Sequence, residues 1–276
     1  MTGFRAGRVA LGLAAALVVL AGCAGTAGAS DRSPESSTGQ TEKQPEKQTE
    51  TQTETLTVFA AASLTLTFTE LADRFEAANP GVTVALNFAG SADLVTQIRE
   101  GAPADVFAAA DLATMAKLSR DGLVDGDPTV FATNTLMIAV PADNPADIAS
   151  FADLAAPGVD VVVCAPAVPC GAARLALEAS AGVRLAPVSE ENAVTDVLGK
   201  ITSGQADAGL VYVTDVAAAG DAVLGIPVAE AEQAPNDYPI AVVAGSGHAR
   251  LGAAFARFVT GATGQRVLGA AGFGAR

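Results

Sequence analysis

Two short stretches of the chain place a serine directly after a turn of small residues. They are residues 58–64 (VFAAASL) and 86–92 (LNFAGSA), and the serines are Ser63 and Ser91. Each stretch predicts an apolar strand, a turn and a helix that the serine opens. A serine hydroxyl there can cap the helix or face a ligand. Because the first backbone N–H groups of a helix have no internal partner, two such turns predict a site for an oxyanion.

Strands and helices alternate along residues 56–276, and these elements must position the two serines. Apolar residues at helical spacing predict helices after both serines, over residues 112–118, after Cys170 and near Ala193, with two more at the C-terminus. Residues 65–69 (TLTFT) also fit a strand. Apolar runs predict strands at residues 56–60, 82–88, 104–109, 135–140, 159–164, 208–213 and 238–244. The alternation predicts an α/β fold with largely parallel sheets, in which ligands bind beyond the carboxyl ends of strands.

The N-terminus predicts export and lipid attachment. Arg5 and Arg8 precede an uncharged, mostly apolar run, and residues 20–23 (LAGC) resemble a bacterial lipobox. That run is short for a membrane span of about 20 residues. We therefore expect a lipoprotein signal peptide at residues 1–22, a lipidated Cys23 and a polar, disordered tether at residues 23–55. The expected location is the extracytoplasmic face of the cell membrane, through the lipid anchor.

Composition narrows the classes of function. The net charge of −14 argues against a nucleic-acid partner, but not against a small anion. The only histidine, His248, lies in a predicted exposed turn (GSGH), so a cysteine hydrolase that used Cys170 would lack a nearby base and is a remote alternative. The only two tyrosines, Tyr212 and Tyr238, are separated in the sequence, unlike the clustered tyrosines of ferric-iron binders, and the cysteine spacing lacks the further ligands of a zinc site.

Several motifs occur in an order and spacing that resemble the periplasmic molybdate-binding proteins of ABC transporters, which are type II solute-binding proteins. They are residues 59–64 (FAAASL), 88–91 (FAGS) with Gln97-Ile98, 101–107 (GAPADVF), 191–194 (ENAV) and 204–212 (GQADAGLVY). The resemblance covers residues 56–276. It implies a two-lobed type II periplasmic-binding-protein fold with mixed sheets, flanking helices and a two-strand hinge.

The resemblance also implies the division into lobes. Lobe 1 would comprise residues 56–136 plus 240–276, and lobe 2 residues 137–239, with the ligand in the cleft between them. The hinge strands would be residues 135–140 and 238–244, and the lobes would close on the ligand.

By position, the resemblance implies five ligand-binding residues. Ser63 and Ser91 would donate through hydroxyl and backbone groups, Cys170 and Val194 through backbone N–H groups, and Tyr212 through its phenol. Molybdate at neutral pH is a fully deprotonated dianion that only accepts hydrogen bonds, so a site of donors without a carboxylate suits it. No cofactor and no direct ligand to the metal atom is implied, and tungstate should bind almost equally well.

The resemblance further implies a non-enzymatic monomer that delivers its ligand to an ABC permease and its ATPase partner. Several alternatives stay open. The serines could be ordinary helix caps, Val194 and Tyr212 could be core residues, and a related protein for sulfate or phosphate would share the fold. The carboxylates nearest the inferred site, Glu191 and Asp215, are expected as helix caps or hinge partners.

Two cysteines remain once Cys23 is assigned to lipid. Disulfides persist in exported domains, and Pro166 and Pro169 suit a tight turn between Cys164 and Cys170. We therefore predict a Cys164–Cys170 disulfide that holds the loop of the ligand site. The alternative is two separate buried thiols.

Overall fold

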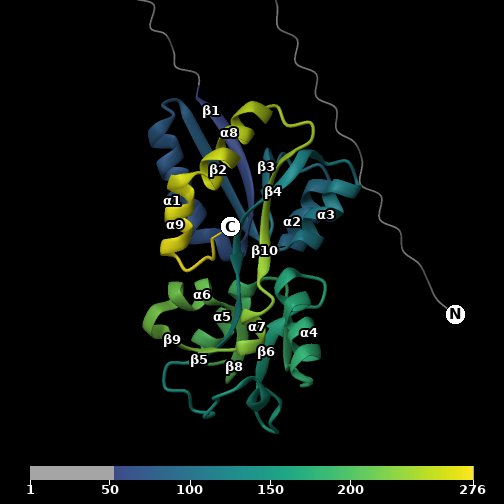
Figure 1. The fold of residues 1–276 in the computed structure, drawn as a ribbon, viewed down its shortest axis with the longest axis vertical. Helices are drawn as coiled ribbons and strands as arrows, with labels where there is room; N and C mark the ends of the chain where they lie inside the picture. Colours follow the sequence, from purple (N-terminus) through teal and green to yellow (C-terminus); the bar gives the residue numbers. More distant parts are fainter. Residues whose placement is uncertain (1–52, 276) are drawn as a thin grey trace, which may run out of the picture. The chain divides into compact units, whose positions relative to one another are not determined.

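The protein is described by a computed structural model that covers residues 53–275. The predicted signal peptide, Cys23 and nearly all of the predicted tether lie outside the described residues. Within residues 53–275, no helix has the length and apolar character needed to cross a bilayer. The fold is α/β, with two five-stranded mixed sheets and flanking helices (Figure 1).

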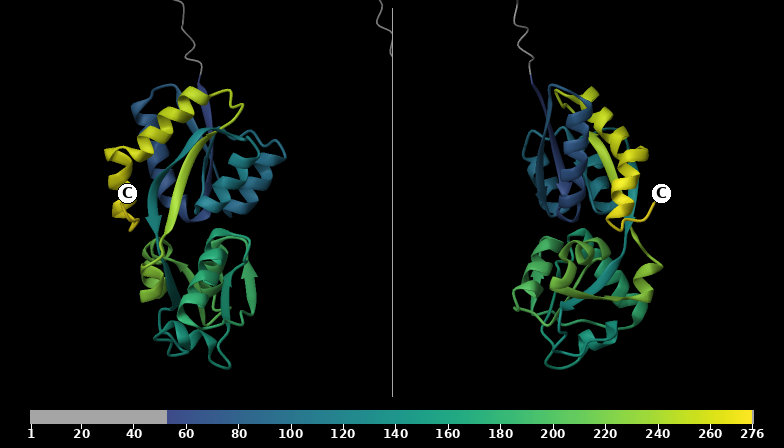
Figure 2. Two further views of the ribbon diagram at one scale, coloured as in Figure 1. Left: turned by 45° about the vertical axis from the view of Figure 1, so that its right-hand side comes forward. Right: turned by 90° about the vertical axis from the view of Figure 1, so that its left-hand side faces the viewer.

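The first sheet has the strand order β2-β1-β3-β10-β4. Strands β1, β2 and β3 are parallel, whereas β10 is antiparallel to both β3 and β4. The strands are β1 (Glu54–Ala61), β2 (Val82–Ala89), β3 (Val106–Ala108), β4 (Val124–Asn134) and β10 (Asn236–Val243). Helices α1 (Thr65–Ala78), α8 (Ala249–Thr260) and α9 (Ala262–Ala270) cover one face, and α2 (Ser91–Arg99) and α3 (Leu112–Arg120) cover the other (Figure 2).

Helix α1 shows how tertiary packing resolves the ambiguous residues 65–69. Phe68, Leu71 and Phe75 are buried on one side of the helix. The Phe75 ring packs edge-to-face on Phe255 of α8, with ring centroids 5.2 Å apart. A strand would send alternate residues to opposite faces, so only the helix buries all three side chains together.

The second sheet has the order β7-β6-β8-β5-β9. Strands β6, β7 and β8 are parallel, and β5 is antiparallel to both β8 and β9. The strands are β5 (Leu136–Pro141), β6 (Val161–Cys164), β7 (Ser189–Glu191), β8 (Ala208–Tyr212) and β9 (Val223–Pro227). The helices of this sheet are α4 (Pro169–Ala181), α5 (Val194–Thr202), α6 (Val213–Ala219) and α7 (Ala229–Glu232). The 3-10 turns within the described residues are η1 (Ala62–Leu64), η2 (Phe151–Ala155) and η3 (Gly220–Ala222).

The described chain passes between the two sheets at two places. It leaves the first sheet at Thr135, between β4 and β5, and returns through residues 228–235, which include α7. At the first passage the buried Asn134 donates to the Thr214 hydroxyl of α6 at 2.8 Å and accepts the Thr135 N–H at 2.9 Å. These two hydrogen bonds fix the backbone where it changes sheets. We call each sheet with its helices a lobe.

The structure corrects the largely parallel sheets expected from the alternation of strands and helices, and it confirms the mixed sheets that the resemblance implies. Strands β4, β5, β9 and β10 make antiparallel pairs, so neither sheet is largely parallel. Strand β4 was not predicted because it is polar at its start and contains Pro128. It lies at a sheet edge, where a missing N–H is tolerated. The short strand β7, strand β9 and helix α6 were not predicted either.

Candidate functional site

A small cavity of about 20 Å³ lies between the lobes, and we call it the interlobe cavity. It is lined by Ala61, Ala62, Ser63, Gly90, Ser91, Ala110, Val168, Pro169, Cys170, Asn192, Ala193, Val194 and Tyr212. All five residues expected to bind the ligand are in this set. No lining residue has a charged side chain. Pockets for larger organic ligands measure about 300–1,000 Å³, so this cavity suits a compact ligand.

Three helices begin at the cavity, and none of them is capped by a side chain. Helix α2 begins at Ser91, α4 at Pro169 and α5 at Val194. Their N-cap residues Gly90, Val168 and Ala193 make no capping hydrogen bond through a side chain, so the first N–H groups have no such acceptor. Since proline has no N–H, the first donor of α4 belongs to Cys170. The positive ends of three helix dipoles therefore converge on an uncharged cavity.

Neither serine caps a helix, so the capping interpretation is wrong. Ser91 is buried, and its Oγ accepts the backbone N–H of Ala110 at 3.1 Å. Ser63 lies inside η1 rather than at a helix start, since α1 begins at Thr65. Its Oγ lies 3.0 Å from the Tyr238 hydroxyl, and either oxygen can donate. Because a protein donor engages the Ser91 oxygen, the Ser91 proton stays available to a ligand.

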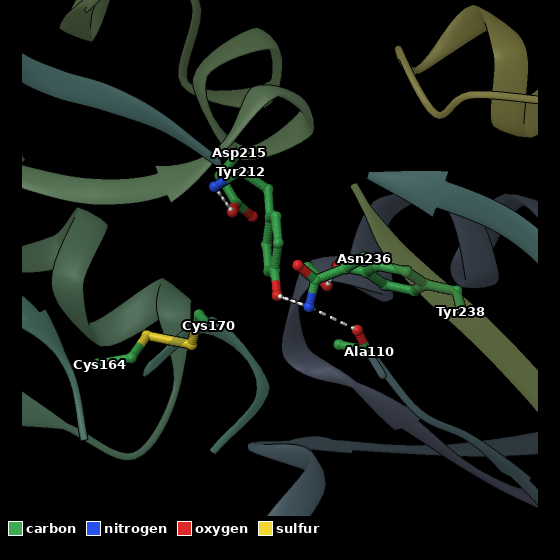
Figure 3. The surroundings of a disulfide bond; sticks show 8 residues. Ala110, Cys164, Cys170, Tyr212, Asp215, Asn236 and Tyr238 are labelled. Carbon is green, nitrogen blue, oxygen red and sulfur yellow. Dashed lines mark hydrogen bonds between the residues drawn. A yellow bond between two sulfur atoms is a disulfide. The ribbon is translucent and has the colours of Figure 1, made fainter. Parts of the chain in front are cut away.

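Tyr212 is the last residue of β8 and is buried. Burial raises the pKa of its phenol well above the usual range, with smaller contributions from Tyr238, Asp215 and Asp111, so the group is a neutral donor at physiological pH. Its oxygen accepts a hydrogen bond from Asn236 Nδ2 at 3.1 Å (Figure 3). The same amide nitrogen donates to the Ala110 carbonyl at 3.1 Å.

The predicted disulfide is present. Cys164 at the end of β6 is bonded to Cys170 in the first turn of α4, with Cα atoms 5.6 Å apart (Figure 3). The alternatives of two separate thiols and of a Cys170 nucleophile are therefore wrong. A ring this short contributes about 2 kcal/mol in the loop-entropy model. Gly171 adds to the constraint, because a Cβ there would meet the Ala165 carbonyl oxygen at 1.8 Å.

The two nearby carboxylates do not line the cavity. Asp215 is buried and accepts the Tyr212 N–H at 2.8 Å at the start of α6, so its predicted capping role is confirmed. Burial raises the pKa of Asp215 to about 7, against the lowering effect of that hydrogen bond. Glu191 accepts a hydrogen bond from Lys200 of α5, which lowers the pKa of Glu191. Both carboxyl groups have partners of their own and leave the cavity without a negative charge.

His248 lies outside the interlobe cavity. Its side chain is 39% exposed, and its Nδ1 lies 3.3 Å from the Asp105 carboxylate. The predicted exposed turn is thus partly correct, with a contact that the sequence did not indicate. Within residues 53–275, no group of three or more His, Cys, Asp or Glu side chains is arranged to hold a metal ion.

Sequence reasoning missed four residues around the cavity. Ala110 and Asn192 line it, and Asn236 and Tyr238 hydrogen-bond the hydroxyls that do. Asn192 lies in the motif at residues 191–194, but no role was assigned to it, and the other three belong to none of the motifs. The only sequence feature near the last two is an asparagine shortly before a predicted strand, which is too common to predict a site.

A two-lobed α/β fold with a small cavity between the lobes defines the class of solute-binding proteins. The family model described as "Bacterial extracellular solute-binding protein" matches residues 56–274, and the chain belongs to this family. Within it, the chain is 46% identical over 264 residues to "Molybdate-binding protein ModA" of Mycobacterium tuberculosis, covering 95% of this chain and 98% of that protein.

Two solved structures share the fold. The periplasmic molybdate-binding protein of Azotobacter vinelandii matches with a TM-score of 0.70 and 24% identity, over 80% of this chain and 99% of that one. The sulfate-binding protein SubI of Mycobacterium tuberculosis matches with a TM-score of 0.68 and 24% identity, over 80% of this chain and 86% of that one. At this identity both comparisons bear on the fold alone.

Proposed function

We propose that the protein binds molybdate, and tungstate with it, in the interlobe cavity and delivers the anion to an ABC importer. One observation carries the proposal: Ser63, Ser91, Cys170, Val194 and Tyr212 line one cavity without a charged side chain. The 46% identity to a mycobacterial protein named for molybdate binding supports the choice of anion. The proteins it resembles are named for binding, so we propose capture without turnover, by a monomer.

The donors of the cavity match the chemistry of a deprotonated oxyanion. Each helix N-terminus contributes about half a positive charge, so the three helices offset most of a dianion without lysine or arginine. The serine and tyrosine hydroxyls add charge-assisted hydrogen bonds, which are roughly twice as strong as neutral ones. An enclosed carboxylate would repel the ligand, and none lines the cavity.

Sulfate and phosphate are the competing ligands. Molybdate, tungstate and sulfate are all tetrahedral dianions, so a preference for molybdate and tungstate over sulfate must come from the size of the cavity. Phosphate at neutral pH exists as its singly and doubly protonated anions, so essentially all of it carries a proton, and that proton needs an acceptor. The fold does not decide between these anions, because it is shared with a sulfate-binding protein.

Calorimetric titration of the purified protein with molybdate, tungstate, sulfate and phosphate tests the proposal. We expect tight binding of molybdate and tungstate at one site per chain, with little heat from sulfate or phosphate. Heat from sulfate or phosphate without heat from molybdate would refute the assignment. A melting temperature that rises with molybdate concentration provides an independent readout, because a ligand that binds only the folded state stabilises it.

We also propose that Cys23 carries a lipid that holds the protein on the extracytoplasmic face of the membrane. The support is the positively charged start, the short apolar run and the lipobox-like residues 20–23. Cys23→Ser should move the protein from the membrane fraction to the soluble fraction or leave it unprocessed. A mature wild-type protein that begins at another residue and has no lipid mass would contradict this proposal.

A further inference from the structure

Asn236 joins the two sides of the interlobe cavity. It begins β10 of the first sheet, and it reaches Tyr212 at the end of β8 in the second sheet. Its Nδ2 also donates to the Ala110 carbonyl, just after β3. A carbonyl only accepts hydrogen bonds, so the nitrogen of the amide, and not its oxygen, must face Ala110. The hydrogen bond to the phenol therefore has a fixed direction: the phenol oxygen accepts.

The Ala110 peptide extends this arrangement to the opposite wall of the cavity. Ala110 accepts from Asn236 through its carbonyl and donates through its N–H to Ser91 Oγ. Two of the three cavity hydroxyls, those of Tyr212 and Ser91, thus receive a hydrogen bond from the protein. Each hydroxyl keeps one proton to donate.

The Tyr238 hydroxyl also interacts with the Tyr212 phenol. It competes for the phenol proton when the cavity holds no anion. An oxyanion is the stronger acceptor, because hydrogen bonds to a charged group are roughly twice as strong as neutral ones. The phenol proton is therefore expected to turn to the anion when it binds.

We propose that Asn236 is a positioning residue, which makes the Tyr212 phenol an obligate donor and so favours fully deprotonated oxyanions over protonated ones. The inference rests on the proposed function, since it concerns the same cavity. It goes further by assigning part of the selectivity to a residue outside the cavity lining. Asn236 acts through the phenol and need not touch the ligand.

A double-mutant cycle with molybdate as the probe tests this role. Asn236→Ala should weaken molybdate binding about tenfold in the otherwise unchanged protein, but less than twofold when Tyr212→Phe is also present. Asn87→Ala is the matched control, because the Asn87 side chain donates to Gln97 and lies outside the cavity. That control should bind molybdate as the wild type does.

Asn236→Asp gives a second readout that a purely structural role would not produce. An ionised carboxylate would accept a hydrogen bond from the phenol O–H and leave the phenol lone pairs facing the cavity. Molybdate affinity should fall by at least tenfold, while phosphate affinity stays level or rises, so the molybdate-to-phosphate ratio drops. If Asn236→Ala does not fold, Asn236→Asp still tests the positioning role.

The possible results of these experiments distinguish a failure of the proposed molybdate binding from a failure of the role inferred for Asn236. A wild-type protein that does not bind molybdate would refute the proposed function, and this inference with it. A wild-type protein that binds molybdate, combined with equal losses from Asn236→Ala with and without Tyr212→Phe, would refute the inference alone. An unchanged molybdate-to-phosphate ratio in Asn236→Asp would also refute it.

Discussion

Replacing Gly90 with alanine is expected to weaken molybdate binding about a hundredfold while leaving the unliganded protein folded. Gly90 precedes α2 in the first lobe, and an added Cβ would meet the Asn192 carbonyl oxygen of the second lobe at 2.1 Å. Real Cβ atoms essentially never approach closer than 3.0 Å, so the lobes would have to move apart. Donors from both lobes could then no longer reach one anion. Losing a hydrogen bond to a charged group costs about 1.5–3 kcal/mol.

The matched control for this prediction is Gly199→Ala. Gly199 lies in α5, the helix that follows Asn192, and nothing lies within 4 Å of its added Cβ. This variant should bind molybdate normally and be more stable by about 0.5–1 kcal/mol, because alanine favours a helix. Titration calorimetry and melting curves with and without molybdate give both quantities. Wild-type affinity in Gly90→Ala would show that the close contact between the lobes is not needed for binding.

The second large effect is expected for the serines. Ser63→Ala and Ser91→Ala should each weaken molybdate binding about tenfold to a hundredfold, since each removes a hydroxyl that we propose donates to the charged ligand. Ser91→Ala should also lower the free energy of unfolding by about 1–3 kcal/mol, because the buried Ala110 N–H loses its acceptor. Ser63→Ala should have a smaller effect on stability, since Ser63 shares its hydrogen bond with a hydroxyl that can rotate.

Ser119→Ala is the control for the serine variants. Ser119 hydrogen-bonds the Met115 carbonyl inside α3 and does not line the cavity. It should change neither the molybdate affinity nor, by more than about 0.5 kcal/mol, the stability. The measurement pairs calorimetry below the melting transition with thermal unfolding of the same preparations. If affinity is unchanged in both cavity variants, the hydroxyls do not bind the ligand.

Much of this architecture could be predicted from local patterns. The strand and helix around each serine turn follow from apolar periodicity, and the position of Tyr212 at a strand end was also correct. Strand β4 escaped prediction because its stability comes from pairing with β10, more than 100 residues away in sequence, and not from its own apolar residues. Pairing between distant segments leaves no periodic trace in either one.

The residues of the site likewise divide into those with a local sequence pattern and those whose role depends on contacts between distant elements. Ser63 and Ser91 could be found because small-residue turns before helices have a local signature. The direction of their hydrogen bonds could not, because it depends on Ala110 and Tyr238, which come from other elements. Asn236 was missed for the same reason: its role exists only where β10 and the end of β8 meet. Geometry between elements, rather than residue type, determines what these groups do.

A cavity without charged side chains has a consequence for rates. The chain carries a net charge of −14, so a dianion is repelled as it approaches and no lysine or arginine in the cavity lining attracts it. Dissolved salt screens that repulsion beyond about 8 Å at physiological ionic strength. The forces inside the interlobe cavity act over a single hydrogen-bond length and are screened much less. Added salt should therefore speed the association of an anionic ligand and leave its release nearly unchanged, which is the reverse of the behaviour of a site built from cationic side chains.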